Sequence, residues 1–260
     1  SGRSRWMMKT KIALLQFKST GKDNLPKALS LARRALDRGA KIVCLPEVFR
    51  HDYFPIRKKT KVGRLLETID GESVTAFRVL AKEYKSVIIV PIYRKPGRFN
   101  AAVIIDHKGR CAEYKKTHIP HDQYYWEKNY FTPGPGDFPV VKTPYGNIAV
   151  GICYDQWYPE VARIYALRGA DIVFYPTAIG TIKGDAQREG NWRDAWLTIQ
   201  RSHSIANSIH IAAVNRVGGE GDIQFFGSSF LTNPFGKILA LASDSREKVL
   251  LADADFSQNK

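Results

Sequence analysis

The sequence predicts an α/β fold in which two mixed β-sheets pack face to face and helices cover the outer faces. Apolar runs of strand length alternate with amphipathic helical segments along most of the chain, as in strand–helix–strand units. Residues 101–105 and 111–115 flank a turn, so a hairpin adds antiparallel strands to this alternation. Residues 39–46 and 169–176 are alike, and this internal repeat favours two sheets of similar construction.

The first half of the chain follows the alternating pattern. Asn24 and Pro26 begin a helix whose apolar residues recur at helical spacing, and Gly39 follows as its C-terminal stop. The run at 87–90 is apolar throughout, which is typical of a strand covered on both faces. The expected elements are strands at 11–17, 42–45, 87–90, 101–105 and 111–115 and helices at 25–36 and 73–85.

The second half begins with a loop and then returns to the alternation. Proline and glycine crowd residues 132–137, which predicts an ordered loop or turn. The run at 148–152 predicts a strand that leads into Cys153. The further expected elements are helices at 161–168 and 192–208 and strands at 172–175, 211–214, 228–231, 237–241 and 249–252.

The composition indicates a globular protein. The chain has 260 residues, 44% of them hydrophobic, which suits one sizeable core. No run approaches the roughly 18 apolar residues that a membrane span requires, and no signal segment opens the chain. We therefore expect a soluble, cytoplasmic protein with no membrane partner. Three cysteines at wide spacing fit reduced thiols better than disulfides or a zinc cluster.

The net charge of +15 would suit a partner rich in phosphate. The basic residues are spread along the chain, however, and the densest run, at 57–61, has no nucleic-acid-binding motif beside it. A solvated basic surface is the favoured interpretation, with no specific nucleic acid expected. A non-catalytic, basic nucleic-acid-binding protein is the alternative from another class.

Cys153 is the first candidate for catalysis because it is a thiol at the C-terminal end of a predicted strand, where open α/β sheets expose reactive groups. Glu47 and the pair Lys115 and Lys116 also follow predicted strands. Glu47 could take the thiol proton, and a lysine could favour the thiolate and stabilise an oxyanion. The N–H of Tyr154 is a second candidate donor. Together these groups describe acyl transfer to water through a thioester, although each alone also fits a structural role.

Three segments carry a resemblance to a known family. They are LPEVF at 45–49, YKKTHIP at 114–120 and ICYDQWYPE at 152–160. In these segments, and over nearly its whole length after Met8, the sequence resembles the nitrilase, or carbon–nitrogen hydrolase, superfamily and within it the N-carbamoylputrescine amidase branch. The resemblance implies a four-layer α-β-β-α sandwich and a catalytic triad of Glu47, Lys116 and Cys153. It selects Lys116 over Lys115.

The resemblance implies further features. Residues 124–134 look like the family segment with a second active-site glutamate, so Glu127 is expected to orient Lys116 or the leaving group; a salt-bridged loop residue is the alternative. A single carbon–nitrogen hydrolase domain is expected over 8–260, with residues 1–7 left from expression. Relatives usually continue with a tail that packs on a neighbouring subunit, and this sequence ends without one. A homo-oligomer, at least a dimer, is expected.

The resemblance also bears on the substrate. Relatives that cleave N-carbamoyl-amino acids have an arginine where this chain has Gln156, which favours a cationic or neutral tail over an anionic one. The expected substrate is an N-carbamoyl amine such as N-carbamoylputrescine, or another amide. Another superfamily amidase, such as an ω-amidase or aliphatic amidase, or a nitrilase is the alternative. Candidate substrate contacts are Asp155, Gln156, Trp157, Glu160 and Thr177, with Asp185 and Glu189 as further carboxylates.

This chemistry requires no metal and no organic cofactor. The six histidines offer no convincing set of metal ligands. His118 and His121 flank Ile119 and Pro120, and this spacing is more typical of loop packing than of zinc binding.

Overall fold

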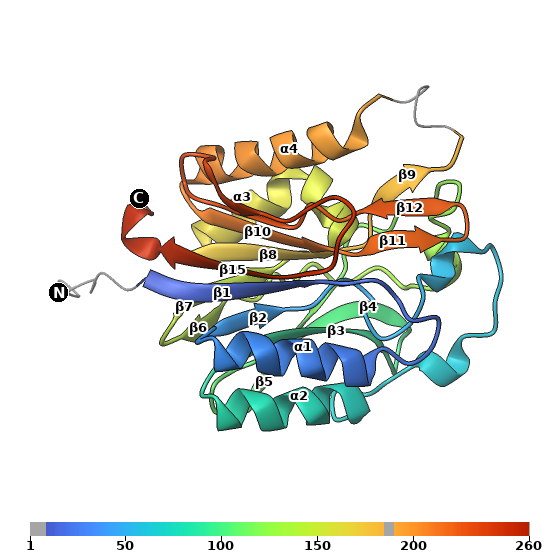
Figure 1. Ribbon diagram of the computed structural model, residues 1–260, viewed down its shortest axis with the longest axis horizontal. Coiled ribbons are helices and arrows are strands. Elements are labelled where there is room, and N and C mark those ends of the chain that lie inside the picture. Colours follow the sequence, from blue (N-terminus) through green and yellow to red (C-terminus); the bar gives the residue numbers. More distant parts are fainter. Residues whose placement is uncertain (1–8, 185–189, 260) are drawn as a thin grey trace.

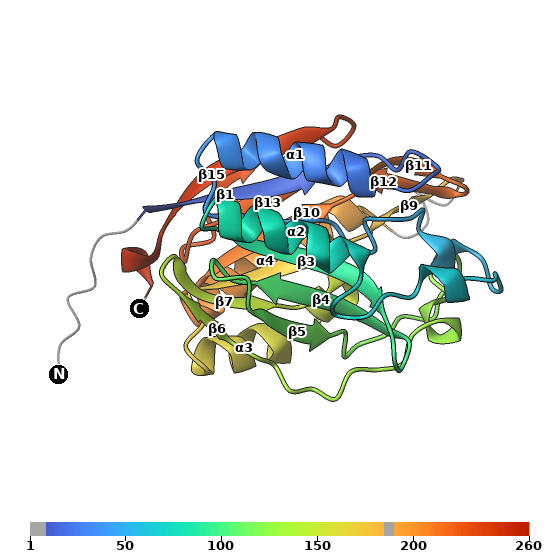
Figure 2. The ribbon, with the colours of Figure 1, turned by 90° about the horizontal axis from the view of Figure 1, so that it is seen from below.

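Four layers stack in the computed structural model, which describes residues 9–184 and 190–259 (Figure 1). Helices α1 and α2 cover one six-stranded sheet, and α3 and α4 cover the other. Seen from below, α1 and α2 lie side by side across the first sheet (Figure 2). This arrangement confirms the predicted sandwich of two mixed sheets. The helices are α1 (Leu25–Asp37), α2 (Glu72–Glu83), α3 (Pro159–Leu167) and α4 (Trp192–Asn207).

The two large sheets share one pattern of strand pairing. In each, three central strands are parallel and the outer strands are antiparallel. The repeated segments supply the middle parallel strand of each sheet, β2 and β8. The first sheet has the order β15 (Lys248–Asp255), β1 (Lys9–Gln16), β2 (Ile42–Cys44), β3 (Val87–Arg94), β4 (Phe99–Ile105), β5 (Cys111–Lys115). The second has the order β14 (Ile238–Leu241), β13 (Phe230–Thr232), β10 (His210–Asn215), β8 (Ile172–Thr177), β7 (Gly146–Val150), β6 (Val141–Thr143).

The middle residues of the central strands are apolar because both faces of these strands are buried. On β1, Ile12 and Leu14 join the core that contains the inter-sheet contacts, whereas Ala13 and Leu15 join the core beneath α1 and α2. Successive side chains of a strand point to opposite faces, so a strand between a sheet and a helix layer must be apolar at every position.

A third, small sheet was not predicted. It has the order β11 (Val217–Glu220), β12 (Ile223–Phe226), β9 (Gly180–Ile182), and all its pairings are antiparallel. These strands are short and β11 contains Gly218 and Gly219, so their apolar pattern is weak. The strand predicted to run into Cys153 is also shorter than expected. It ends at Val150, and Cys153 cannot belong to it because this residue has a left-handed φ of 43°.

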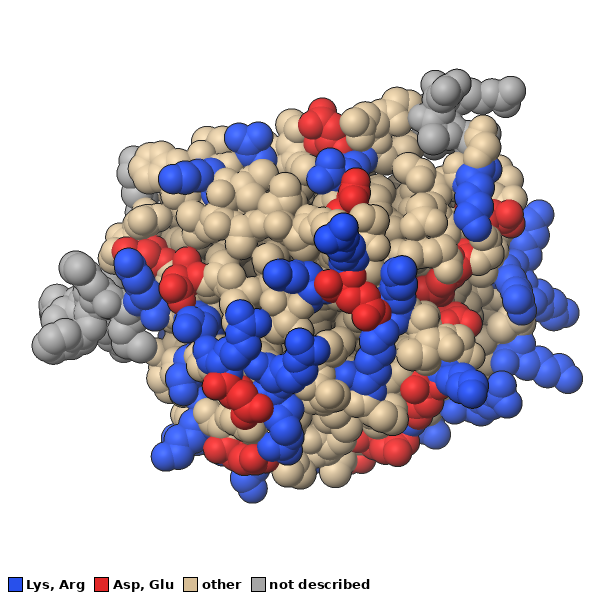
Figure 3. All heavy atoms as spheres, viewed as in Figure 1, with Lys and Arg blue, Asp and Glu red and all other residues tan. Residues whose placement is uncertain are grey.

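The surface that faces the viewer in Figure 3 has Lys and Arg side chains spread across it with Asp and Glu among them. No helix within residues 9–184 and 190–259 is both long enough and apolar enough to cross a bilayer.

Candidate active site

Cys153 lies at a sharp turn between β7 and α3. It begins a short 3₁₀ helix, Cys153–Trp157, and its left-handed φ of 43° is unusual for a residue with a side chain. Gly151 makes the turn possible, because a Cβ there would lie 2.5 Å from the ring of Tyr175. The thiol is 3.8 Å from the carbonyl oxygen of Ala178, to which it donates. The turn therefore directs the sulfur away from the sheet.

Lys116 lies between two buried glutamates. Its Nζ is 2.7 Å from Glu47 Oε1 and 2.7 Å from Glu127 Oε2, and all three side chains are fully buried. Glu47 follows β2, Lys116 follows β5, and Glu127 begins a short 3₁₀ helix, so the cluster joins three separate segments. The structure thus places Lys116 at the site. Lys115 instead points to the surface and pairs with Glu113 at 3.1 Å.

The pKa values of the cluster reflect burial and mutual charge. Burial alone would lower the pKa of Lys116, but the charges of Glu127 and Glu47 outweigh it and raise that pKa, so the lysine stays an ammonium. Burial raises the pKa of Glu127 to about 7, against the lowering effect of Lys116. Burial also raises the pKa of Cys153, and the charge of Glu47 adds to this. The resting thiol is therefore protonated near neutral pH and requires a base.

Glu47 has one free oxygen. Its Oε1 accepts from Lys116 and, at 2.7 Å, from the amide of Asn100. Its Oε2 is buried and accepts from no group in the described part of the chain. Buried carboxylate oxygens are usually hydrogen-bonded, and a catalytic role is one explanation for an oxygen that is not. Oε2 is thus the basic atom that is available to a proton.

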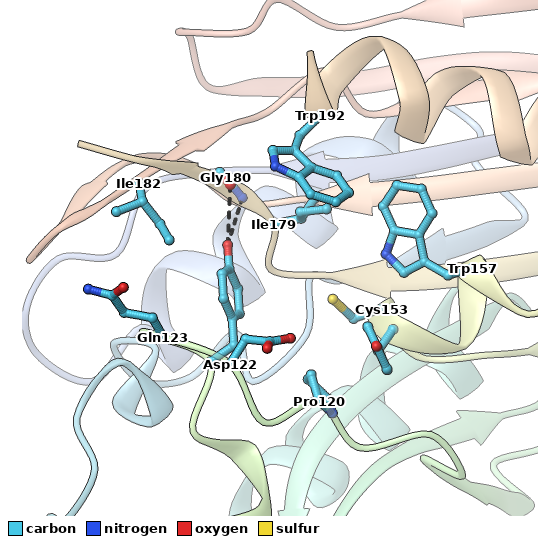
Figure 4. A pocket seen from close by; sticks show the side chains of 11 residues that line it. Pro120, Asp122, Gln123, Cys153, Trp157, Ile179, Gly180, Ile182 and Trp192 are labelled. Atoms are coloured by element: carbon cyan, nitrogen blue, oxygen red, sulfur yellow. Dashed lines mark hydrogen bonds between the residues drawn. The ribbon is translucent and has the colours of Figure 1, made fainter. Parts of the chain in front are cut away.

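The sulfur faces a cavity of about 300 Å³. Figure 4 shows Cys153, Trp157 and Ile179 around this space, with the carboxylate of Asp122 directed into it. Among the lining residues that the structure describes, Asp122 carries the only charge. The described lining residues are Pro120, Asp122, Gln123, Tyr125, Cys153, Tyr154, Trp157, Ile179, Gly180, Ile182 and Trp192.

One wall of the cavity is the segment between β8 and β9. The side-chain amide of Asn215 binds both backbone groups of Ile179, accepting from its N–H at 3.0 Å and donating to its carbonyl at 2.9 Å. The hydroxyl of Tyr125 accepts from the N–H of Gly180 at 3.1 Å. These bonds fix the Ala178 carbonyl that accepts from the thiol.

The comparisons with known proteins assign the family. The family model of the carbon-nitrogen hydrolases matches residues 11–259. The chain belongs to the carbon–nitrogen hydrolase family. Its fold agrees, because the crystal structure of a carbon-nitrogen hydrolase from Helicobacter pylori G27 has a TM-score of 0.91 and 36% identity, covering 97% of this chain and 91% of that one.

Two curated relatives of this carbon–nitrogen hydrolase differ in name. An N-carbamoylputrescine amidase from Oryza sativa subsp. japonica is 38% identical, over 97% of this chain and 88% of that protein. A citrullinase from Francisella tularensis subsp. tularensis is 35% identical, over 96% of this chain and 90% of that protein. The predicted superfamily is confirmed.

Four predicted substrate contacts lie away from the cavity of this hydrolase. Asp155 is fully buried and accepts from the backbone N–H groups of Ile152 and His118 and from the hydroxyl of Tyr114. The expectation that Asp155 contacts the substrate is therefore wrong, because both of its oxygens already accept hydrogen bonds within the protein. Glu160 is exposed in the first turn of α3 and lines a different groove, between α3 and α4.

Gln156 and Thr177 are structural as well. Both are fully buried, and Gln156 Oε1 accepts from the hydroxyl of Thr177 at 3.2 Å and from the indole of Trp196 at 2.7 Å. Neither lines the cavity, and the bonds that they make hold α4 on the turn, which corrects the expected substrate contacts; Gln156 Nε2 is buried and has no partner in the described part of the chain. Of the predicted contacts, Trp157 does line the cavity, as does Tyr154. Asp185 and Glu189 lie outside the described residues.

Several site residues were missed from the sequence. Tyr53 donates its hydroxyl to Glu127 Oε1 at 2.5 Å, and Asn100 binds Glu47. Asp122 and Trp192 line the cavity. A polar residue at the edge of the apolar run 101–105 was the one signal for Asn100; the others follow from folding alone. Within residues 9–184 and 190–259, no three His, Cys, Asp or Glu side chains gather in a way that could bind a metal ion.

Proposed function

We propose that this hydrolase cleaves the C–N bond of an N-carbamoyl amine with Cys153 as nucleophile, Glu47 as base and Lys116 as charge stabiliser. The observation that carries the proposal is the free Oε2 of Glu47, whose other oxygen pairs with Lys116, beside a thiol that faces a cavity. A protonated thiol and an available carboxylate are the two partners that nucleophilic attack needs.

The reaction proceeds in two stages. Sγ of Cys153 bonds to the ureido carbon while Glu47 takes the thiol proton. The oxyanion is stabilised by the ammonium of Lys116 and the N–H of Tyr154. The proton passes from Glu47 to the departing nitrogen, and ammonia leaves an S-carbamoyl thioester. Glu47 then takes a proton from water, which attacks the same carbon, the C–S bond breaks, and the proton passes from Glu47 to the sulfur to restore the thiol. The carbamic acid that is released breaks down to carbon dioxide and the amine.

Glu127 has a supporting role in this proposal. It pairs with Lys116 at 2.7 Å and accepts from Tyr53 at 2.5 Å, so it fixes the ammonium between two carboxylates. The second carboxylate keeps Lys116 charged while Glu47 is protonated during attack. Without Glu127, the lysine would lose its ionised partner at the moment when the oxyanion forms.

The substrate tail is proposed to end in an ammonium group near Asp122. The curated relatives include N-carbamoylputrescine amidases, and Asp122 is the single charge among the described lining residues. Trp157 and Trp192 stand edge to face at 5.8 Å and supply ring faces that attract cations. Asp122 is exposed at the mouth of the cavity, so its effect on affinity is expected to be modest.

Ammonia release from N-carbamoylputrescine, measured with wild type and Cys153→Ala, tests the reaction. We expect steady turnover by wild type and none by the variant. Equal turnover by both proteins would remove Cys153 as nucleophile. If wild type instead prefers a simple amide or a nitrile in a substrate panel, the alternative activities within the superfamily replace the carbamoyl amine.

Asp122→Asn tests the tail. We expect kcat/KM to fall about 2- to 5-fold for N-carbamoylputrescine and to stay unchanged for N-carbamoylbutylamine, whose tail has no charge. An equal fall for both substrates would mean that Asp122 does not recognise the ammonium. Citrulline, which adds a carboxylate to the tail, should be the poorer substrate.

A homo-oligomer in the cytoplasm stays a prediction, and light scattering would determine the oligomeric state.

A further inference from the structure

The loop that carries Glu47 has a strained backbone. Val48, the next residue, has a φ of 48° and is buried. A β-branched residue in the left-handed region is a genuine outlier, and such a conformation persists only where its surroundings enforce it. Because the strain is adjacent to Glu47, whatever enforces it also determines where the Glu47 carboxylate lies.

Arg216 binds this loop through its backbone. The residue lies between β10 and β11, is 2% exposed, and donates to the carbonyl of Glu47 at 3.2 Å and to that of His51 at 2.6 Å. It also donates to the carbonyl of Val48. The opposite side of the guanidinium pairs with Glu220 Oε1 at 2.8 Å. A planar group with five donors in a fixed fork can make this set of bonds, and a lysine cannot.

The hydrogen bonds continue from Glu220 into the charged cluster and return to the loop. Glu220 Oε2 accepts from the backbone N–H of Tyr53 at 2.6 Å, and the hydroxyl of Tyr53 donates to Glu127 at 2.5 Å. Glu127 and Glu47 share the ammonium of Lys116. The bonds therefore form a closed ring that connects β11 with all three charged groups of the site.

We infer that Arg216, oriented by Glu220, is a positioning residue that fixes Glu47 for proton transfer from Cys153. The hydrogen bonds of Arg216 go to backbone carbonyls of the Glu47 loop and to Glu220, and Glu220 in turn accepts from the backbone N–H of Tyr53, so both residues act through this loop. The inference rests on the proposed function in one respect, the role of Glu47 as base. It does not depend on which substrate is hydrolysed.

Alkylation of Cys153 by iodoacetamide, followed by peptide mass mapping that separates it from the partly exposed Cys111, tests this inference without any substrate. We expect Arg216→Lys to slow alkylation at pH 8 about tenfold, because a displacement of about 1 Å suffices for losses of this size. With a substrate that the wild type hydrolyses, kcat of Arg216→Lys should fall while its KM changes less than about threefold. Failure of N-carbamoylputrescine as a substrate would leave the alkylation result intact, so the two failures are distinguishable.

A double-mutant cycle separates positioning from general loss of structure. If Arg216 acts through Glu47, Arg216→Lys should have no further effect on alkylation in the Glu47→Gln background. Glu220→Gln keeps Arg216 and its bonds to the loop carbonyls but offers one acceptor oxygen where Arg216 and the Tyr53 N–H use two, and it should slow alkylation in the same direction by about threefold. An undiminished effect of Arg216→Lys in the Glu47→Gln background would overturn the inference, as would alkylation at the wild-type rate in both Arg216→Lys and Glu220→Gln.

Arg50→Lys is the matched control. Arg50 belongs to the same loop and is also a largely buried arginine, but its ion pairs are with Asp23, Glu67 and Glu72 and not with Glu220. We expect this variant to lose stability and to alkylate within about twofold of wild type. An equal slowing in Arg50→Lys would show that any disturbance of the loop suffices and would overturn the specific role of Arg216.

Discussion

Replacing Lys116 by glutamine removes the charge that allows two carboxylates to be buried together. The ammonium nitrogen is 2.7 Å from an oxygen of Glu47 and 2.7 Å from an oxygen of Glu127, with no exposure of any of the three side chains. Breaking a buried ion pair by removing one partner costs about 3–5 kcal/mol, and a domain of this size loses about 2–4 °C in Tm per kcal/mol. We therefore expect Lys116→Gln to lower Tm by about 6–20 °C near pH 8.

The size of this loss should depend on pH. Lys116 lowers the pKa of Glu127, which burial raises from 4.5 to about 7, so without the lysine that pKa must rise further. A carboxyl with a folded pKa above its unfolded value is stabilising where it is protonated. That contribution is lost as the pH rises from the unfolded pKa to the folded one. The difference in Tm between wild type and Lys116→Gln should therefore be widest near pH 8 and narrow toward pH 5.

Thermal unfolding followed by circular dichroism at pH 5 and pH 8 measures both effects. Lys115→Gln is the control, because the ammonium of Lys115 pairs with partly exposed Glu113 and lies 4.8 Å from the Phe99 ring centre. We expect that variant to lose less than about 1 kcal/mol. If the difference in Tm for Lys116→Gln is the same at both pH values, or if Lys115→Gln loses as much, the reasoning from buried charge is refuted.

Three further predictions concern other parts of the site. In Asp155→Asn, a single amide oxygen replaces two carboxylate oxygens that both accept hydrogen bonds. We expect the free energy of unfolding to fall by about 1–3 kcal/mol and kcat to fall as well, and an unchanged chemical denaturation curve would contradict this. Gly180→Ala would place a Cβ 2.3 Å from the carbonyl oxygen of Gln224, which should separate β9 from β12 and reduce kcat/KM at least about tenfold. Unchanged kinetics would mean that this wall of the cavity does not position the substrate. Because burial and the charge of Glu47 raise the pKa of Cys153, the rate of its alkylation should keep rising from pH 7 to pH 9, and a plateau below pH 8 would indicate a preformed thiolate.

Much of the fold could be predicted from the sequence because its strands are buried on both faces. Such strands are unbroken apolar runs that differ clearly from the amphipathic helices between them, as at 42–45 and 87–90. The repeat at 39–46 and 169–176 predicted two similar sheets, and the pairings of β2 and β8 agree. The small sheet of β9, β11 and β12 escaped prediction because short, glycine-containing strands have little periodicity.

The candidate site, too, could be predicted only in part. Cys153, Glu47 and the lysine pair were evident as reactive groups just past predicted strands, and the family motifs selected Lys116. The roles of the polar residues around them were not evident. Asp155 and Gln156 lie two and three residues after the nucleophile and looked like substrate contacts, yet both are buried, and the oxygens of Asp155 and the side-chain oxygen of Gln156 accept from other groups of the protein. The sequence of a motif does not show whether a carboxylate in it faces a cavity or accepts from a backbone N–H.

The sequence by itself determined the family, the alternation of strands and helices, and the three groups expected to carry the chemistry. These depend on composition and order along the chain, which local physical rules can interpret. The tertiary structure decided that the ammonium of Lys116 lies between Glu47 and Glu127, which carboxylate faces the cavity, and that Arg216 binds the loop of Glu47. Those contacts join segments far apart in the chain, up to 169 residues for Arg216 and Glu47, and only folding sets the distances on which charge and hydrogen bonding depend.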